Sequence, residues 1–391
     1  MEAIDRLIGN EAEFPILGKW HFFNHAGVAP IPRRAADAIG AYAMQSAEQA
    51  YIDCHWFATI DQLRQNVAKL MNATADEIAF VKNTSEGLAL VANGIDWRPG
   101  DRIVTTAVEY PANAYPWLDL VERKGIELIR VPEEVREEGV RLVPLDAILR
   151  AADAPRTRLV TISHVEFASG QRHDLAAIGK FCRDRGIRLC VDGIQSLGAL
   201  PVDVRAMNID YLSADGHKWL LGPEGAGVFY CRQELIEQTH PALIGWLNVQ
   251  NAHDFDHIEY RLKKDAGRFE CGTYNVPGLL GLKASVDVLM EAGGQAVSGQ
   301  VQLLTDRLAV GLKGQGWVVV SPRERGTEQG AEKGVWSGIV SFVREGLDAT
   351  ATAKRLKGDG IELAVRGGRL RVSPHFYNTV KQMDRLLEAL G

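Results

Sequence analysis

The stretch Arg188-Leu189-Cys190-Val191-Asp192-Gly193-Ile194-Gln195 contains the clearest fold signal in this sequence of 391 residues. Its first four residues are nearly all apolar, which predicts a short strand buried on both faces, as in parallel sheets covered by helices. A polar run that begins with an acid follows at once. Ligands of open α/β sheets lie beyond the carboxyl ends of the strands, so this order also predicts a site after the strand.

Short apolar runs and helical patterns alternate on both sides of this stretch. The helix expected before it ends at Gly186, because glycine is a natural C-cap. Strands that alternate with helices predict a mainly parallel sheet with helices on both faces, which is the α/β class. The expected strands are residues 103–106, 126–131, 159–163, 211–213 and 226–230, and the expected helices are residues 117–124, 145–152 and 175–185.

The pattern changes between about residues 240 and 270, where the chain becomes irregular and mixed in charge. Beyond it we expect helices at 277–290 and 299–314 and strands at 317–320, 338–343 and 370–372. The sequence therefore predicts three parts. Residues 1–20 form an N-terminal arm that packs with the small domain, residues 21–260 form a large mainly parallel-sheet domain, and residues 261–391 form a smaller α+β C-terminal domain.

Composition excludes several classes of function. The net charge is −6, which argues against a nucleic-acid partner, because such proteins carry a basic face, and against a membrane surface. We find no apolar run of the ~20 residues that a transmembrane helix needs, and the first residues lack the pattern of a signal peptide. The five cysteines form no C-x-x-C pair, so reduced thiols and a cytoplasmic location are the simplest interpretation.

Charged groups follow two of the expected strands. Asp192 ends one of them, and Lys218 follows the other in Asp215-Gly216-His217-Lys218, 26 residues later. Pyridoxal 5′-phosphate (PLP) requires a carboxylate at its pyridine nitrogen and an amine for a Schiff base. Taken singly, Asp192 is more simply a helix cap and Lys218 a surface charge, but the combined string favours PLP.

A phosphate site is the expected use of Thr84 and Ser85. They precede a helix that should begin near Glu86, so hydroxyls and free backbone N–H groups meet at its N-terminus. Thr and Ser are also common N-caps, so this signal needs the other motifs beside it.

Six motifs together resemble the class V aminotransferase-fold enzymes, which include cysteine desulfurases, isopenicillin N epimerase-like proteins and kynureninase. The resemblance covers roughly residues 20–390 and implies PLP fold type I, the aspartate aminotransferase-like architecture. Its D-G-x-Q and G-H-K pair is specific for this group. The motifs are Asn24-His25-Ala26-Gly27, Thr84-Ser85-Glu86-Gly87, Val191-Asp192-Gly193-Ile194-Gln195, Asp215-Gly216-His217-Lys218, Arg268-Phe269-Glu270-Cys271-Gly272-Thr273 and Leu370-Arg371-Val372-Ser373.

The resemblance implies a role for each matching residue. Lys218 would form the Schiff base and move protons at the substrate Cα, and Asp192 would pair with the pyridinium nitrogen. Gln195 would bond the phenolic oxygen, Tyr110 would stack on the ring, and Thr84, Ser85 and His217 would contact phosphate. Thr273 would reach the phosphate of a partner subunit, which implies a homodimer with shared active sites. Arg371 would hold the substrate carboxylate, with Asn24 and His25 near the substrate.

Three departures from the desulfurase pattern matter. The region between Arg366 and Arg371 has no cysteine and no room for the desulfurase loop, so desulfuration through an enzyme persulfide is not expected. Asp215 replaces a phosphate-binding serine, so it must turn away, bind a cation or be paired. Phe167 replaces an asparagine and, with Gly245-Trp246, points to the epimerase and kynureninase branches.

Two further assignments concern ligands. We expect no metal site, because the spacings of His25, His164, His253 and His257 fit no known helix or hairpin site. Arg366 is either a second anchor for a substrate anion or a surface arginine.

The reaction itself stays open among a few classes. We favour an amino-acid enzyme of the lyase or transaminase kind, with an epimerase as the next hypothesis. A protein of a different class, a non-catalytic PLP-fold sensor or scaffold, is the alternative. This non-catalytic alternative is disfavoured because the chain keeps all of the expected catalytic and binding residues, Lys218, Asp192, Gln195, His217 and Arg371.

Overall fold

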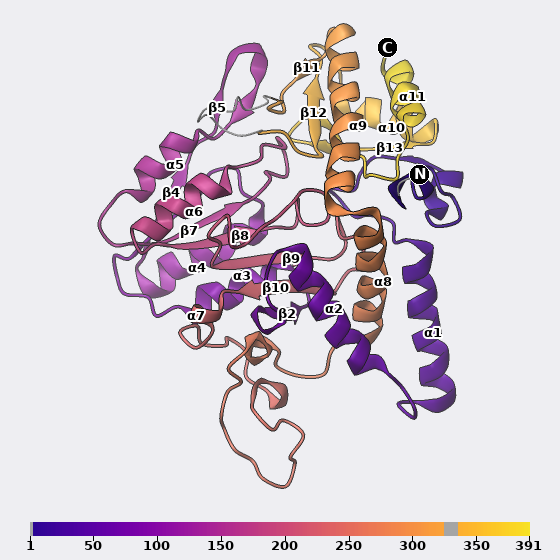
Figure 1. The fold of residues 1–391 in the computed structure, drawn as a ribbon. Helices are drawn as coiled ribbons and strands as arrows, with labels where there is room; N and C mark the ends of the chain where they lie inside the picture. Colours follow the sequence, from indigo (N-terminus) through magenta and orange to yellow (C-terminus); the bar gives the residue numbers. More distant parts are fainter. Residues whose placement is uncertain (1–2, 324–334) are drawn as a thin grey trace.

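The computed structural model describes residues 3–323 and 335–391 (Figure 1). A seven-stranded sheet forms its centre, in the order β2-β10-β9-β8-β7-β3-β4. Strand β10 runs antiparallel to β2 and β9, and the other neighbours are parallel, so the predicted mainly parallel α/β sheet is confirmed. The strands are β2 (Ile78–Val81), β3 (Arg102–Thr106), β4 (Glu127–Val131), β7 (Thr157–Ser163), β8 (Arg188–Asp192), β9 (Tyr211–Asp215) and β10 (Gly227–Cys231).

Strand β8 is buried on both faces, as its apolar run predicts. Leu189 and Val191 belong to one hydrophobic cluster, and Cys190 between them belongs to the cluster on the opposite face. Helices cover both faces and contribute to these clusters together with the other strands. They are α1 (Arg33–Gln49), α2 (Trp56–Leu70), α3 (Thr84–Gly94), α4 (Tyr115–Lys124), α5 (Leu145–Ala152), α6 (Leu175–Asp184), α7 (Gln233–Ile236) and α8 (Val276–Ala292).

Helix α3 begins two residues earlier than expected. Asn83, rather than a residue nearer Glu86, is its N-cap, and the Asn83 side chain accepts the Glu86 N–H at 2.9 Å. Asparagine is among the best N-caps, because its short side-chain oxygen reaches the free N–H groups of the first turn. Thr84 and Ser85 therefore lie within the first turn of α3 instead of ahead of it.

A four-stranded antiparallel sheet lies in the C-terminal part, in the order β11-β12-β15-β14. Its strands are β11 (Val318–Val319), β12 (Val340–Val343), β14 (Ala364–Arg366) and β15 (Arg369–Val372). Helices α9 (Gly294–Gly314), α10 (Ala349–Gly358) and α11 (Val380–Leu390) pack with it around a third cluster. The smaller α+β unit of the predicted fold class is thus present.

The N-terminal segment packs against the C-terminal part, and Figure 1 shows both ends of the chain on that side. Strand β1 (His21–Phe22) pairs with β13 (Ile361–Glu362). The ring of Phe14 stacks on that of Tyr377 at 3.9 Å. Helix α8 packs instead against α1 and α2, and the boundaries at residues 20 and 260 stay predictions.

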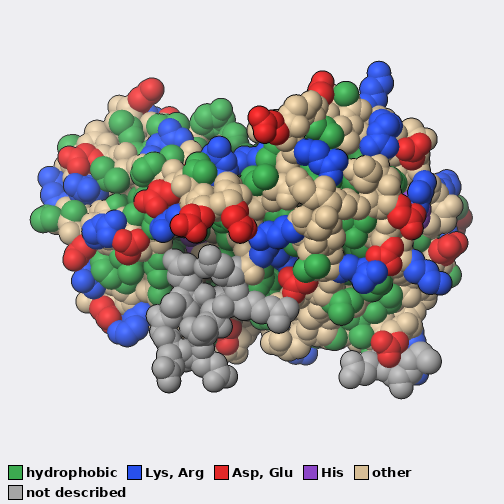
Figure 2. All heavy atoms as spheres, turned by 90° about the horizontal axis from the view of Figure 1, so that it is seen from above, with side chains coloured by type: hydrophobic (Ala, Val, Ile, Leu, Met, Phe, Trp, Pro, Cys, Tyr) green, Lys and Arg blue, Asp and Glu red, His purple; other side chains and the backbone are tan. Residues whose placement is uncertain are grey.

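Charges of both signs are interspersed on the face shown in Figure 2, which agrees with the small net charge of −6. Within residues 3–323 and 335–391, no helix is long and apolar enough to cross a bilayer.

Candidate active site

A pocket of about 580 Å³ lies at the carboxyl ends of β8 and β9, beside the first turn of α3. Ten of the twelve predicted site residues line it, while His25 and Thr273 lie elsewhere. The ten are Asn24, Thr84, Ser85, Tyr110, Asp192, Gln195, His217, Lys218, Arg366 and Arg371. The topology explains the convergence, because the ends of neighbouring parallel strands meet at one edge of a sheet.

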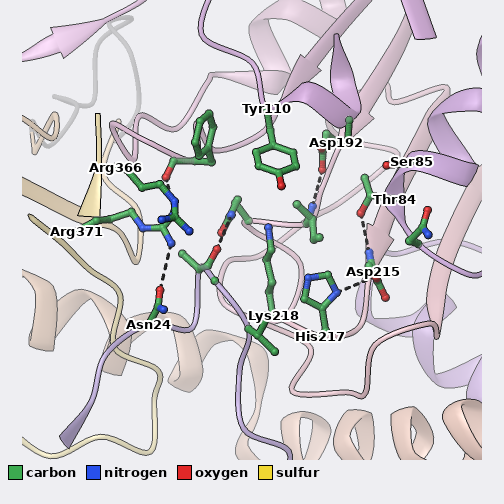
Figure 3. A pocket seen from close by; sticks show the side chains of 18 of the residues that line it. Asn24, Thr84, Ser85, Tyr110, Asp192, Asp215, His217, Lys218, Arg366 and Arg371 are labelled. Atoms are coloured by element: carbon green, nitrogen blue, oxygen red, sulfur yellow. Dashed lines mark hydrogen bonds and ion pairs between the residues drawn. The ribbon is translucent and has the colours of Figure 1, made fainter. Parts of the chain in front are cut away.

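Lys218 occupies the middle of this pocket (Figure 3). It is 8% exposed, and its Nζ lies 5.4 Å from the centre of the Tyr110 ring. Burial lowers the pKa of Lys218 to about 8. The carboxylate of Asp192 opposes this effect, and the positive guanidinium of Arg371 reinforces it. At physiological pH the amine is still mostly protonated, but a far larger share of it is neutral than for an exposed lysine.

Asp192 ends strand β8 and turns into the pocket. Its Oδ1 accepts the N–H of Ile194 at 3.0 Å. Burial raises the pKa of Asp192 to about 6, against the opposing effects of that N–H group and of Lys218. The carboxylate is therefore ionised at neutral pH, although it lies in a poorly hydrated place.

Two more buried carboxyl groups lie behind Asp192. Glu109 accepts the backbone N–H and the hydroxyl of Ser163 at 2.7 and 2.6 Å, and burial raises its pKa. Glu166 accepts the hydroxyl of Thr106 at 2.9 Å, and burial raises its pKa to about 8. Glu166 is not among the predicted site residues, although its place just after β7, at the same edge of the sheet as Asp192, was a usable signal.

Gln195 is held in one orientation by two hydrogen bonds. The indole N–H of Trp219 donates to its Oε1 at 3.0 Å, and its Nε2 donates to the carbonyl of Ala26 at 3.0 Å. The second hydrogen on Nε2 remains for a ligand. Trp219 is fully buried, so its packing fixes the direction in which Gln195 faces.

Asp215, which replaces a phosphate-binding serine of the desulfurases, is paired within the protein. Of the three expectations for it, turning away, binding a cation or being paired, the structure shows the last. Its Oδ1 accepts the N–H of Gly216 at 2.7 Å, and its Oδ2 lies 2.8 Å from Nδ1 of His217. Its own N–H donates to Oγ1 of Thr84 at 3.0 Å. These contacts join the end of β9 to the start of α3, and Figure 3 shows those of Asp215 with His217 and Thr84 on one side of Lys218.

Arg366 and Arg371 enter from the side opposite to Thr84 and Ser85 (Figure 3). Arg371 is 1% exposed and donates to the carbonyl of Phe167 at 2.8 Å and to Oδ1 of Asn24 at 3.2 Å. Burial, and then the charge of Arg366, lower the pKa of Arg371 to about 9, so it stays charged at neutral pH. The pocket thus has a cationic end.

His25 lies behind the wall of the pocket and is fully buried. Its Nδ1 is 2.8 Å from the carbonyl of Ser373, and its Nε2 is 2.6 Å from the hydroxyl of Tyr377. Because a carbonyl only accepts, Nδ1 carries the proton and Nε2 accepts from Tyr377. In this arrangement both ring nitrogens join the N-terminal segment to the residues after β15.

Thr273 lines a separate small cavity with Lys82, Glu86 and Cys271. It is therefore not in the Lys218 pocket of its own chain. A role for Thr273 at a cofactor phosphate requires a second subunit, as the resemblance implies.

Comparisons with known proteins concern the whole chain. The family model described as Aminotransferase class-V matches residues 21–386. A probable cysteine desulfurase of Methanothermobacter thermautotrophicus is 31% identical over 97% of this chain and 96% of its own length. The apo structure of a cysteine desulfurase from Thermococcus onnurineus NA1 is 28% identical, with a TM-score of 0.84 over 96% of this chain and 95% of that one.

A cystine C–S lyase, C-DES, is similar to the same degree. Its complex with the reaction product cysteine persulfide is 27% identical, with a TM-score of 0.86 over 96% of this chain and 98% of that one. A mutant of C-DES with glycine covalently linked to its PLP cofactor is 26% identical, with a TM-score of 0.87 over 97% of this chain and 98% of that one.

Proposed function

The chain belongs to the aminotransferase class-V family, and we propose that it is a PLP-dependent enzyme that acts at the Cα of an amino-acid substrate. The observation that carries the proposal is the position of Lys218. Its amine lies in one buried pocket between the carboxylate of Asp192 and the guanidinium of Arg371. This order matches an amino acid bound by its carboxylate beside a cofactor held by a lysine.

The residues present fit the cofactor at three points. At the phosphate end, the first turn of α3 offers N–H groups without intrahelical partners, together with the hydroxyls of Thr84 and Ser85. At the phenolic oxygen, Gln195 offers its second amide hydrogen. At the pyridine nitrogen, Asp192 offers Oδ2, to which no residue in the described part of the chain forms a hydrogen bond.

Each of these side chains then has a chemical task. When bound, PLP supplies an electron-withdrawing ring that stabilises negative charge at the substrate Cα. Asp192 holds a proton on the ring nitrogen. Lys218, with a pKa of about 8, accepts and returns a proton at Cα near neutral pH. Arg371 fixes the substrate carboxylate and so orients the bond that breaks.

We favour β-elimination, a lyase reaction, over transfer of sulfur to the protein. No cysteine occurs among the described residues that line the pocket. Cys182, Cys190 and Cys231 are buried, and burial raises the pKa of each thiol, which makes it a poor nucleophile. The similarity to a cystine C–S lyase supports the same choice.

We further propose a homodimer in which Thr273 of each subunit serves the other's site. Several large apolar side chains lie exposed on the projecting segment between α7 and α8 (Figure 1), as expected for a surface that a second copy covers. They are Leu243, Ile244, Trp246, Phe255, Ile258 and Tyr260.

The visible spectrum of the purified protein with PLP tests the cofactor proposal. A lysine-bound cofactor gives a band at roughly 410–430 nm, which the Lys218→Ala variant should lose. Lys180→Ala is the matched control, because Lys180 is an exposed residue paired with Asp184, and it should keep the band. A wild-type protein that PLP leaves colourless would instead indicate a sensor or scaffold that lacks PLP chemistry.

A screen of amino acids separates the reaction classes. A lyase releases ammonia and the β-substituent, for example sulfide from cysteine. An epimerase exchanges the Cα hydrogen with solvent deuterium and inverts the centre. A transaminase passes the amino group to an added keto acid. A persulfide found on the protein after incubation with cysteine would overturn the choice of β-elimination.

A further inference from the structure

We propose that Arg366 binds a second anionic group of the substrate, so that the pocket takes an α-amino acid whose side chain ends in an anion. This inference rests on the proposed function and names the substrate class of the same site. It starts from two guanidinium groups at one end of the pocket (Figure 3).

A tight hairpin holds Arg366 at this place. In the pairing of β14 with β15, Ala364 lies opposite Arg371, and Arg366 lies opposite Arg369. Cross-strand partners share a face, and so do residues two apart on a strand, so Arg366 and Arg371 point to the same side of the hairpin. Gly367 and Gly368 form the turn with φ of +55° and +73°, as the preferred two-residue turns require. The short turn fixes the backbone from which the Arg366 side chain enters the pocket.

Arg371 forms two hydrogen bonds within the protein and keeps donors for a ligand. Its two terminal nitrogens donate to the carbonyl of Phe167 and to Asn24, while its buried Nε has no hydrogen-bond partner among the described residues. The remaining capacity suits one carboxylate. In the proposed function that carboxylate is the one on the substrate Cα.

Arg366 then remains without an anion. Its Nη1 donates to the carbonyl of Val365 at 2.9 Å, and no carboxylate in the described part of the chain forms an ion pair with Arg366 or Arg371. The acidic residues of the pocket, Asp192 and Asp215, lie beyond Lys218 and contact other groups (Figure 3). Arg371 is buried and Arg366 is half-buried, and two like charges side by side in such a place are unfavourable until anions neutralise them. One substrate carboxylate neutralises one of them, and a second anion neutralises the other.

Isosteric pairs of amino acids test this directly. Titrations of the PLP-loaded protein with L-aspartate against L-asparagine, and with L-glutamate against L-glutamine, are followed by the change in the visible cofactor spectrum. We expect the wild type to bind at least one acidic member on the order of tenfold more tightly than its amide, because a charge-assisted hydrogen bond is at stake. The Arg366→Gln variant should bring this ratio to about one by weakening only the acidic member.

Arg369→Gln is the matched control, because Arg369 lies on the same hairpin but does not line the pocket, and it should keep the wild-type ratio. Should Arg366→Gln fail to fold, Arg366→Lys retains the charge without the planar fork and should give an intermediate ratio. Equal affinity for acid and amide in the wild type, or equal weakening of both by Arg366→Gln, overturns the inference. A wild type without the cofactor band refutes the proposed function itself, whereas a band without acid preference refutes only the role of Arg366.

Discussion

Nδ1 of His217 lies 2.8 Å from Oδ2 of Asp215, at the end of β9 and beside the first turn of α3. The same Asp215 accepts the N–H of Gly216 and donates its own N–H to Thr84. An acid at a proposed phosphate site is unfavourable by charge alone. Here it orients the imidazole next to it and connects the two segments that would hold the phosphate.

Replacement of Asp215 tests this pairing. We expect Asp215→Asn to weaken PLP binding by several-fold, because the amide keeps its volume but loses the anionic partner of His217. The measurement is a titration of apoprotein with PLP, followed by absorbance. Glu224→Gln, at an exposed position nearby in the sequence, should bind PLP as the wild type does. Tighter binding by Asp215→Asn would mean that repulsion of phosphate outweighs the orientation of His217.

The pH dependence of cofactor capture follows from the burial of Lys218. A lysine attacks an aldehyde only as the neutral amine, and burial lowers the pKa of Lys218 to about 8 from 10.5. The rate at which apoprotein takes up PLP should therefore rise with pH and reach half its maximum near pH 8. Stopped-flow absorbance between pH 6 and 10 measures this rate. A midpoint near 10.5 would contradict a buried amine.

The burial of Lys218 should also lower the stability of the apoprotein at neutral pH. The folded protein disfavours the charged amine, so the cost is fully present below pH 8 and is relieved as the pH rises toward 10.5. At pH 7, Lys218→Met should raise the free energy of unfolding by on the order of 3 kcal/mol, because the lowered pKa of about 8 already includes the attraction to Asp192. Urea unfolding at pH 7 and pH 10 measures it, and the gain should shrink at the higher pH.

Asp192 should affect turnover more than cofactor retention. Asp192→Asn cannot hold a proton on the ring nitrogen, so we expect turnover to fall by at least about a hundredfold, while Lys218 still gives the visible band. Activity and absorbance are measured on the same sample. Asp146→Asn, at an exposed position on α5, should change neither. Wild-type turnover in Asp192→Asn would remove Asp192 from the proposed mechanism.

Gly338 supports the site through Trp219. A Cβ at residue 338 would lie 2.4 Å from the Trp219 ring, and that indole fixes Gln195. Gly338→Ala should therefore lower the free energy of unfolding by about 1–3 kcal/mol and weaken PLP binding as well. Gly299→Ala in α9 meets open space and should be neutral or slightly stabilising. Unchanged PLP affinity in Gly338→Ala would mean that the packing of Trp219 does not control how Gln195 meets the cofactor.

The sequence by itself determined the α/β architecture and most of the pocket. Apolar runs such as Leu189–Val191, caps such as Gly125 with φ of +65°, and the polar residues after β8 and β9 act over a few neighbouring residues. Such local signals can be recognised in the sequence, because the alternation of a strand and the ends of a helix depend on neighbouring residues. They placed Asp192 and Lys218 at one edge of the sheet.

Only the tertiary structure decided how these side chains face one another. His25 and Tyr377 are 352 residues apart, and Arg371 and Asn24 are 347 apart, yet each pair shares a hydrogen bond. Such contacts also decide three details of the site. Asp215 pairs with His217, Trp219 orients Gln195, and His25 lies behind the wall of the pocket. Their physical reason is packing between distant segments, which no local pattern encodes.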